Sequence, residues 1–260
     1  MLDNAQRRDA GVKLVALARE ATRAAEALLA EATAAVRQRV MVEDHLVEAL
    51  FDREQRATHG LAWLATYVES VRQLAAYAER MHEGGALGEI EELLVQIGIG
   101  EHLAQIAGGI PMSQGEIVRP ADVGLTAEAV AARMASALQG FSAQGNVERR
   151  ARLVELMRAH PDATVGDCGL DEMLGTIRDE MRKFADSEVM PYAQGWHRTN
   201  SYIPIEVLTQ MSELGVFGLT IAEEYGGLGL GKESMCVVSE ELARGYIGVG
   251  SLGTRSEIAA

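Results

Sequence analysis

The chain has 260 residues, a net charge of −14 and a hydrophobic fraction of 48%, which suffices for one large or two modest hydrophobic cores. Its Lys and Arg residues form no basic stripe, so the composition argues against a nucleic-acid partner and against binding to an anionic membrane. Without an apolar run at the start, or the roughly 20 apolar residues of a membrane span, the sequence predicts a cytoplasmic protein with no membrane partner.

The first predicted element is one long helix from Asp3 to about Arg39. It is rich in alanine, lacks proline and repeats apolar residues at intervals of three and four, which is typical of an amphipathic helix. These residues are Leu14, Leu17, Ala21, Ala25, Leu28, Ala32 and Ala35 or Val36. Their small side chains allow a second helix to pack closely against this face.

A second helix is predicted from about Val42 to Met81, with Asp44 as its N-cap. Gly60 is a position at which this helix could be interrupted. The Gly84-Gly85 pair ends it, because glycine reaches the left-handed conformation without a Cβ penalty.

A third helix is predicted from Leu87 to about Ile106. Gly98 and Gly100 inside it indicate either close packing against a neighbouring backbone or a local break. The turn-rich segment from Gly108 to Leu125 predicts an irregular connection, long enough to be a functional loop.

Two shorter helices follow. Thr126 opens one that runs to about Leu138, and Asn146 caps another from Val147 to His160. The next residues, Pro161 to Gly169, have the Pro, Gly and Asp composition of a linker. The sequence therefore predicts a helical extension over residues 1–160, a linker over residues 161–170 and a second helical domain over residues 171–260.

The second domain is also predicted to be helical. An amphipathic helix passes through Ile177 and Met181 and ends near Pro191. Further helices run from Pro204 to Gly215 and from Lys232 to Arg244, and another begins at Ser251. No period-2 strand is found, so the predicted fold class is all-α.

Several short motifs follow one another in the second domain. They are Val189-Met-Pro191, the segment from Trp196 to Pro204, Leu214-Gly-Val-Phe-Gly-Leu219, Thr220-Ile-Ala-Glu-Glu-Tyr-Gly-Gly-Leu-Gly-Leu-Gly231 and Ser239-Glu-Glu-Leu-Ala-Arg-Gly245. In order, spacing and residue type they resemble the first helical domain of the flavin-dependent acyl-CoA dehydrogenases. The resemblance covers about a third of the chain. Ala222 departs from it, because many relatives have proline there.

The glycine-rich motif is interpreted as a sharp turn between two helices, since residues with a Cβ resist such backbone conformations. Its spacing is not Gly-x-Gly-x-x-Gly and no strand precedes it, so a phosphate-binding loop is not expected.

The family resemblance implies FAD-dependent α,β-dehydrogenation of an acyl-CoA thioester, with electrons passed to an electron-transfer flavoprotein. It also implies a homo-oligomer. In the family a β domain follows this helical domain and the catalytic glutamate lies later still. The chain is therefore expected to stop before the β domain, with the glutamate beyond Ala260, so that no residue here is assigned a catalytic or FAD-binding role.

Motifs in the extension narrow the resemblance. They are Trp63-Leu-Ala-Thr-Tyr-Val-Glu-Ser-Val71, Glu92-Leu-Leu-Val-Gln-Ile-Gly98 and Gly109-Ile-Pro-Met-Ser-Gln-Gly-Glu-Ile-Val-Arg-Pro120. They are similar to the extension of family members that oxidise (2S)-methylsuccinyl-CoA to mesaconyl-CoA in the ethylmalonyl-CoA pathway. The extension could shield the acyl-CoA site or enlarge a subunit interface.

The resemblance also suggests substrate-binding residues. In relatives the helix after the Gly245 turn lines the far end of the acyl pocket, which points to Gly250, Ser251, Thr254 and the adjacent Arg255. Arg255 is suited to bind a substrate carboxylate through two charge-assisted hydrogen bonds. The alternative is a solvated arginine, or one that pairs with an acid such as Glu257.

The remaining candidate residues favour structural roles. Tyr225 and Tyr246 are expected to pack against the core more often than to border a pocket. Cys168 and Cys236 lack a Cys-x-x-Cys spacing and are expected to be reduced, with Cys236 a small buried residue. The six histidines show no metal-ligand spacing, so no metal is expected. A different class of function, a non-catalytic helical interaction or oligomerisation module, remains as the alternative to an enzyme.

Overall fold

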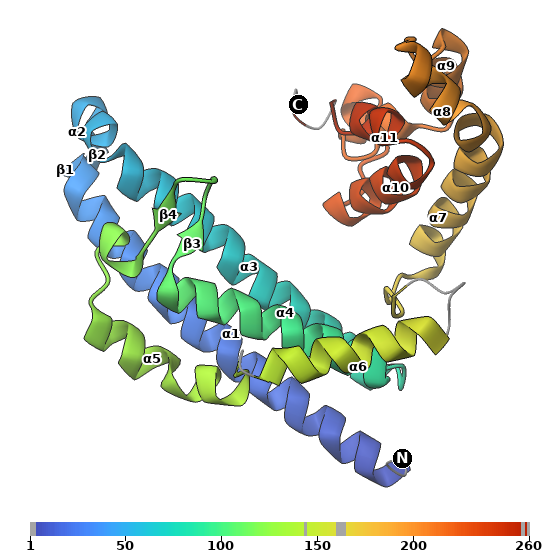
Figure 1. The fold of residues 1–260 in the computed structure, drawn as a ribbon. Coiled ribbons are helices and arrows are strands. Elements are labelled where there is room, and N and C mark those ends of the chain that lie inside the picture. Colours follow the sequence, from blue (N-terminus) through green and yellow to red (C-terminus); the bar gives the residue numbers. More distant parts are fainter. Residues whose placement is uncertain (1–3, 143–144, 160–164, 256–257, 259–260) are drawn as a thin grey trace. The chain divides into compact units, whose positions relative to one another are not determined.

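The computed structural model describes residues 4–142, 145–159, 165–255 and 258. The chain divides into two compact units, residues 1–169 (unit 1) and residues 170–260 (unit 2). Both are built almost wholly from helices (Figure 1), which confirms the predicted all-α fold class. Each unit has its own hydrophobic core.

Unit 1 is a bundle around one long helix. Its helices are α1 (Asn4–Val40), α2 (Glu48–Arg53), α3 (Gln55–Glu83), α4 (Glu89–Gly108), α5 (Ala127–Gly140) and α6 (Asn146–Ala159). α1, α3 and α4 pack side by side, α5 packs on α1 and α4, and α6 packs on α4 (Figure 1). The long first helix is thus confirmed. Its predicted stripe is buried at Leu14, Ala21, Ala25, Leu28, Ala32 and Val36, with Leu17 partly buried.

The connection between α1 and α3 was predicted wrongly. Strands β1 (Met41–Val42) and β2 (His45–Leu46) form a hairpin, and the φ angles of Glu43 and Asp44 at its tip are 49° and 61°. Positive φ at both turn residues matches the right-handed twist of a two-residue hairpin. Asp44 therefore does not cap a helix, and α3 begins only at Gln55.

The segment from Gly108 to Leu125 is also more regular than predicted. Strands β3 (Ile110–Pro111) and β4 (Ile117–Val118) pair as a hairpin, and the 3₁₀ turn η1 (Pro120–Val123) follows. Two-residue strands are too short to show a period of two in the sequence. Gly60 does not interrupt α3 but makes room for this hairpin, since a Cβ there would lie 2.4 Å from Cγ2 of Val118.

The glycines of α4 mark close packing, one of the two predicted alternatives. A Cβ at Gly98 would lie 2.8 Å from Cδ1 of Leu74, and one at Gly100 would lie 2.9 Å from the carbonyl oxygen of Phe141. α4 runs through both positions without a break. Packing against α3 and the end of α5 therefore offsets the low helix propensity of glycine.

Thr126 caps α5 as predicted, and its Oγ1 accepts a hydrogen bond of 3.1 Å from the amide of Ala129. Asn146 is different, since it is the first residue of α6 and its Nδ2 donates to Oε1 of Glu101 at 2.7 Å. Asn146 thus fastens α6 to α4, a role that sequence spacing alone does not reveal.

Replacing Thr126 with alanine is expected to lower the free energy of unfolding of unit 1 by about 1 kcal/mol, because the amide of Ala129 loses its partner. The two tryptophans of the chain lie one in each unit, so the variant Trp196→Phe leaves Trp63 as a fluorescent reporter of unit 1. Urea unfolding in that background measures the loss. Thr126→Ser, which keeps the capping oxygen, should unfold like the parent.

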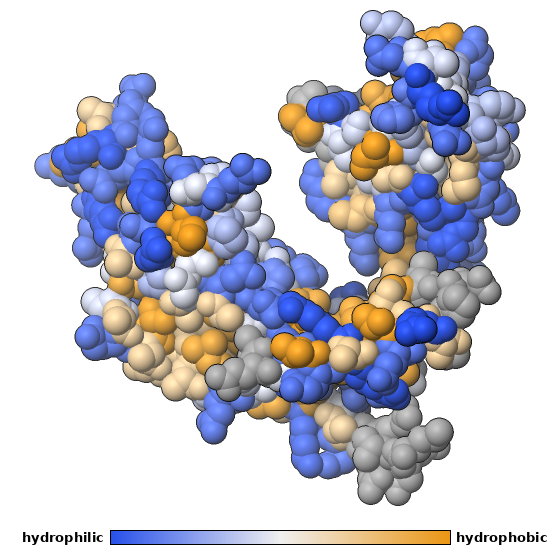
Figure 2. Space-filling model, in the orientation of Figure 1, coloured by the Kyte–Doolittle hydropathy of each residue, from blue (hydrophilic) through white to orange (hydrophobic). Residues whose placement is uncertain are grey.

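α6 is held to α4 largely by charged side chains. Arg152 contacts Glu89 at 2.7 Å and Arg150 contacts Glu101 at 3.0 Å. Apolar side chains of α6 instead face solvent (Figure 2), with Val147 71% and Val154 52% exposed. Exposed ion pairs contribute little stability, so α6 is the least firmly packed of the long helices in unit 1.

The segment 165–169 is tied to unit 1. Oε1 of Glu91 accepts a 2.8 Å hydrogen bond from the amide of Asp167, while Oε2 accepts one from Gly88. The hydroxyl of Tyr77 donates to the carbonyl of Asp167, and burial raises the pKa of Tyr77 to about 12. The rest of the predicted linker, residues 161–164, lies outside the described residues, as does His160.

Unit 2 is a smaller helical array. Its elements are α7 (Glu172–Phe184), the π-helical turn η3 (Ala185–Val189), α8 (Met190–Thr199), α9 (Ile205–Glu213), the 3₁₀ turns η4 (Val216–Gly218) and η5 (Glu223–Tyr225), α10 (Lys232–Gly245) and α11 (Ile247–Gly253). The predicted helix from Lys232 is confirmed as α10. The hydrophobic core of unit 2 contains Met181, Phe184, Val189, Met211 and Leu242.

The helix that was predicted to end near Pro191 continues instead. Pro191 lies in the first turn of α8, directly after the π-helical turn. Proline lacks an amide hydrogen and its ring clashes with the carbonyl four residues earlier in a regular α-helix. The wider π-helical turn accommodates the ring, so the chain stays helical through to Thr199.

Candidate functional site

The suggested substrate-binding residues lie on and just after α11, at its junction with α10. Tyr246 has extended backbone angles (φ −163°, ψ 123°) and separates the two helices. α11 begins at Ile247, four residues before the predicted start at Ser251. Glycines at positions 248, 250 and 253 lower its helix propensity, so packing against α10 rather than local sequence stabilises α11.

Gly250 sets the distance between α11 and α10. A Cβ at this position would lie 2.7 Å from both the Cα and the backbone nitrogen of Ala243. Its neighbour Val249 is fully buried. Gly250 therefore fixes the position of α11, from which the other suggested residues project.

Ser251 and Thr254 are half-buried and bonded within their own helix. Oγ of Ser251 donates to the carbonyl of Gly248 at 3.1 Å, and Oγ1 of Thr254 donates to the carbonyl of Ser251 at 3.0 Å. Each hydroxyl keeps acceptor lone pairs for a further donor. These bonds fix the side-chain rotamers and thereby the direction of the lone pairs.

Arg255 is exposed and follows Thr254, the C-cap of α11. Ile247, at the start of α11, is also 72% exposed. Glu257, the suggested alternative partner of Arg255, lies outside the described residues, and the role of Arg255 stays a prediction.

The two tyrosines take different places. Tyr246 packs on the core, with its ring centroid 6.2 Å from that of Trp196. Tyr225 is 78% exposed, so the expectation of core packing is wrong for this residue. It lies on the short turn η5, which has no buried residue.

Backbone amides of the glycine-rich loop are hydrogen-bonded to nearby backbone carbonyls. The amides of Leu228, Gly229 and Leu230 donate to the carbonyls of Gly218, Ile221 and Leu219, at 2.8 Å in each case. Phosphate-binding loops instead direct several amides at the anion. The loop is therefore a structural turn, in agreement with the sequence interpretation.

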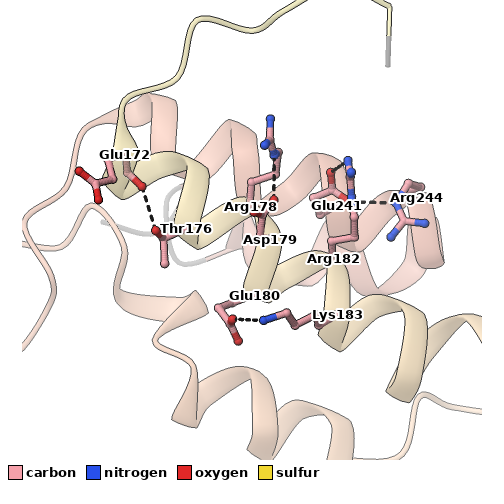
Figure 3. Close-up of polar contacts among 9 residues, drawn as sticks. All are labelled: Glu172, Thr176, Arg178, Asp179, Glu180, Arg182, Lys183, Glu241 and Arg244. Atoms are coloured by element: carbon pink, nitrogen blue, oxygen red, sulfur yellow. Dashed lines mark hydrogen bonds and ion pairs between the residues drawn. The ribbon is translucent and has the colours of Figure 1, made fainter. Parts of the chain in front are cut away.

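An ion-pair network inside unit 2 was not predicted (Figure 3). Glu241 on α10 is 3% exposed, and its carboxylate accepts hydrogen bonds of 3.1 and 2.6 Å from Arg182 on α7 and 2.9 Å from Arg244. Arg244 also contacts Asp186 at 2.7 Å. The network joins α10 to α7 and to the π-helical turn.

The charge of Glu241 is stabilised by these partners. Burial by itself raises the pKa of its carboxyl, yet the hydrogen bonds from Arg182 and Arg244 bring the pKa below its ordinary value. Glu241 is thus an ionised anchor that is fully bonded, and nothing in its geometry indicates contact with a ligand. The sequence signal that could have found it is an acid in the apolar register of a helix.

Cys168 and Cys236 are both exposed, so the expectation of a buried Cys236 is wrong, because its position on α10 faces away from the core. No group of three or more His, Cys, Asp or Glu residues within the described ranges is placed to hold a metal ion. In the same part of the chain, no helix is long and apolar enough to span a membrane.

Comparison with known proteins shows which families and relatives the chain resembles. Residues 171–260 match the family described as "Acyl-CoA dehydrogenase, N-terminal domain". The chain is 52% identical over 249 residues, 95% of its length, to a protein of Cereibacter sphaeroides named (2S)-methylsuccinyl-CoA dehydrogenase, of which it covers 45%.

Other relatives match a shorter part of the chain. A glutaryl-CoA dehydrogenase of Desulfococcus multivorans is 38% identical over 30% of the chain and 21% of the relative. A mitochondrial 2-methylacyl-CoA dehydrogenase of Solanum tuberosum is 36% identical over 34% of the chain and 22% of the relative. The chain thus spans less than half the length of these relatives. Residues 171–260 thus form an acyl-CoA dehydrogenase N-terminal domain.

Proposed function

We propose that the complete protein is an FAD-dependent acyl-CoA dehydrogenase that converts (2S)-methylsuccinyl-CoA to mesaconyl-CoA, and that this chain is its N-terminal part. The observation that carries the substrate is the extent of the match. The 52% identity runs over 95% of the chain and so includes most of unit 1. The matches to other acyl-CoA dehydrogenases cover only about a third of the chain.

When bound, the FAD would supply the redox chemistry, as acceptor of the hydride that leaves the β-carbon while the α-proton is removed. The residues of this chain would help to position the substrate and would take no part in the proton or hydride transfer. The glycine-rich loop does not suit the FAD pyrophosphate, since its amides are already bonded internally. Consequently no residue described here is assigned to FAD, and the base that removes the α-proton is placed outside this chain.

The partners follow from the same proposal. They are an acyl-CoA substrate, an electron-transfer flavoprotein that accepts the electrons, and further subunits of a homo-oligomer in the cytoplasm. The alternative, a helical interaction module without catalysis, is not favoured, because the match to the (2S)-methylsuccinyl-CoA dehydrogenase of Cereibacter sphaeroides runs over both units.

Within this enzyme, Gly250, Ser251, Thr254 and Arg255 would line the far end of the acyl pocket. Gly250 would hold α11 in place, while the hydroxyl oxygens of Ser251 and Thr254 would face the acyl chain. Arg255 would bind the terminal carboxylate of the substrate with two parallel hydrogen bonds. Its exposure in this chain leaves the guanidinium accessible for such a contact.

Replacing Arg255 with methionine in the complete enzyme is expected to raise the KM for methylsuccinyl-CoA about tenfold or more, as expected for the loss of a charge-assisted pair. The KM for a monocarboxylic acyl-CoA should not rise. Steady-state kinetics with both substrates measure the difference. The matched control is Arg198→Met, another exposed arginine of unit 2, and an unchanged substrate preference in Arg255→Met would remove the assignment.

The function itself is tested by the flavin absorbance of the purified complete protein. Anaerobic addition of (2S)-methylsuccinyl-CoA is expected to bleach the long-wavelength flavin band. A preparation of this chain alone provides the comparison and should show no bleaching. Complete protein without flavin would favour the interaction module, and flavin bleached only by another acyl-CoA would retain the family but exclude this substrate.

A further inference from the structure

Where α10 ends, three successive residues contact the π-helical turn η3 and the helix α8 that follows it. Arg244 contacts Asp186 of η3 at 2.7 Å, and the ring centroid of Tyr246 lies 6.2 Å from that of Trp196 on α8. Between them, Gly245 packs directly against η3. The junction between α10 and α11 is therefore held by a second part of unit 2.

The contact of Gly245 with η3 leaves little room for a side chain. A Cβ at Gly245 would lie 3.2 Å from Cβ of Ala185 and 3.3 Å from Cγ1 of Val189, closer than the optimum of about 3.5 to 4.0 Å for carbon atoms. Ala185 and Val189 are both fully buried, and the Cβ of an alanine cannot rotate aside. A side chain at position 245 would therefore push the end of α10 away from η3 by a few tenths of an ångström.

The same junction determines where α11 begins. The carbonyl of Tyr246 accepts hydrogen bonds from the amides of Val249 at 2.9 Å and Gly250 at 3.1 Å. Tyr246 alone separates the end of α10 at Gly245 from the start of α11 at Ile247, so no flexible loop joins the two helices. A displacement at the end of α10 is therefore transmitted to α11.

We propose that Gly245 is a positioning residue of the acyl pocket, whose contact with η3 sets where α11 presents Ser251, Thr254 and Arg255 to the substrate. The inference rests on the proposed function, which assigns those three residues to the pocket. They would meet the distal end of the acyl group and not the carbons that react. Gly245 thus acts on substrate preference, and this close contact explains why the motif that begins at Ser239 ends in glycine.

The ion pair beside Gly245 has a smaller part in fixing the junction. The side chains of Asp186 and Arg244 are 51% and 37% exposed, so solvent screens their attraction. Arg244 also donates to Glu241 at 2.9 Å (Figure 3), which holds its guanidinium without Asp186. The close packing at Gly245 is therefore the contact to change in a test.

Steady-state kinetics of the complete enzyme with Gly245→Ala test the proposal. The KM for (2S)-methylsuccinyl-CoA is expected to rise about three- to tenfold, because a misplacement of about 1 Å can cost about 100-fold and the expected displacement is smaller. The kcat should stay unchanged, as for a loss of binding that is equal in the ground and transition states. The dissociation constant of propionyl-CoA, whose acyl group is shorter, should not rise when measured from the flavin absorbance.

Two further variants separate positioning from a general effect on the fold. Gly175→Ala makes the same change on α7, where no atom lies within 4 Å of the added Cβ, and should behave like the wild type. The double variant Ala185→Gly/Gly245→Ala removes the opposing methyl group and should recover most of the wild-type KM. An unchanged KM in Gly245→Ala, or a double variant as weak as the single one, overturns the proposal.

Fluorine NMR of the complete protein labelled with fluorotryptophan measures the position of the junction independently of activity. The signal of Trp196, assigned by its loss in Trp196→Phe, depends on the neighbouring ring of Tyr246. Gly245→Ala is expected to shift this signal and the double variant to return it, and a signal that does not move overturns the proposal. Failure of the proposed function would instead appear in the wild type, as flavin that (2S)-methylsuccinyl-CoA does not bleach, so the two failures are distinct.

Discussion

Replacing Gly227 with alanine is expected to lower the free energy of unfolding of unit 2 by about 3 kcal/mol, at the upper end of the usual cost of overpacking. A Cβ at this position would lie 2.1 Å from the carbonyl oxygen and 2.4 Å from the Cβ of Ile221. The obstacle is backbone, which cannot move aside as a flexible side chain would. The loop must therefore open, and the hydrogen bonds from its amides to Gly218, Leu219 and Ile221 would be strained or lost.

Urea unfolding followed by the fluorescence of Trp196 measures this effect in a Trp63→Phe background, which removes the signal of unit 1. The matched control is Gly195→Ala. Nothing lies within 4 Å of a Cβ at Gly195, and it is inside α8, so this change should raise the free energy of unfolding by about 0.5 to 1 kcal/mol. Equal unfolding of Gly227→Ala and the parent would show that the loop is not the rigid turn described here.

Replacing Glu241 with glutamine is expected to lower the free energy of unfolding of unit 2 by about 3 kcal/mol at neutral pH, the usual lower range for breaking a buried pair. The neutral amide cannot balance the charges of Arg182 and Arg244, and its NH₂ group would face an arginine donor. The arginines are 38% and 37% exposed, so water stabilises them partly and the loss should not reach the upper range.

The difference between parent and Glu241→Gln should depend on pH. Because the folded protein lowers the pKa of Glu241, the unfolded chain binds the proton more tightly than the folded one. The stabilisation is fully present above the pKa of an unfolded glutamate, about 4.3, and is lost as the pH falls through the lower folded value. Urea titrations at a series of pH values from 7 downward measure the free energies of unfolding of the parent and of Glu241→Gln. The two values should converge as the pH falls below about 4.3.

Glu180, on the neighbouring helix α7, offers a matched control for Glu241. Glu180→Gln removes the same charge from an exposed pair with Lys183 on α7 (Figure 3), and we expect no measurable change in stability, since solvent screens such pairs. Two results would contradict the interpretation that ionised Glu241 stabilises unit 2. One is equal free energies of unfolding for Glu241→Gln and Glu180→Gln, and the other is a difference between Glu241→Gln and the parent that persists at low pH.

The sequence by itself determined the helical fold class, most helix positions and the family of the second domain. Alternating apolar intervals of three and four located α1, and Thr126 marked the start of α5. The motifs from Val189 to Gly245 identified the second domain as that of an acyl-CoA dehydrogenase. These features are local, because helix periodicity, capping and motif order depend on residues close together in the chain.

Tertiary structure decided the features that local patterns cannot encode. The hairpin at Glu43 and Asp44 forms where the antiparallel packing of α1 and α3 reverses the chain. The π-helical turn before Pro191 and the early start of α11 are stabilised by packing on α10, against local propensity. The pairing of Glu241 with Arg182 joins residues 59 positions apart, and no sequence period connects them. Such contacts depend on how helices pack, and packing follows from the whole core rather than from any one segment.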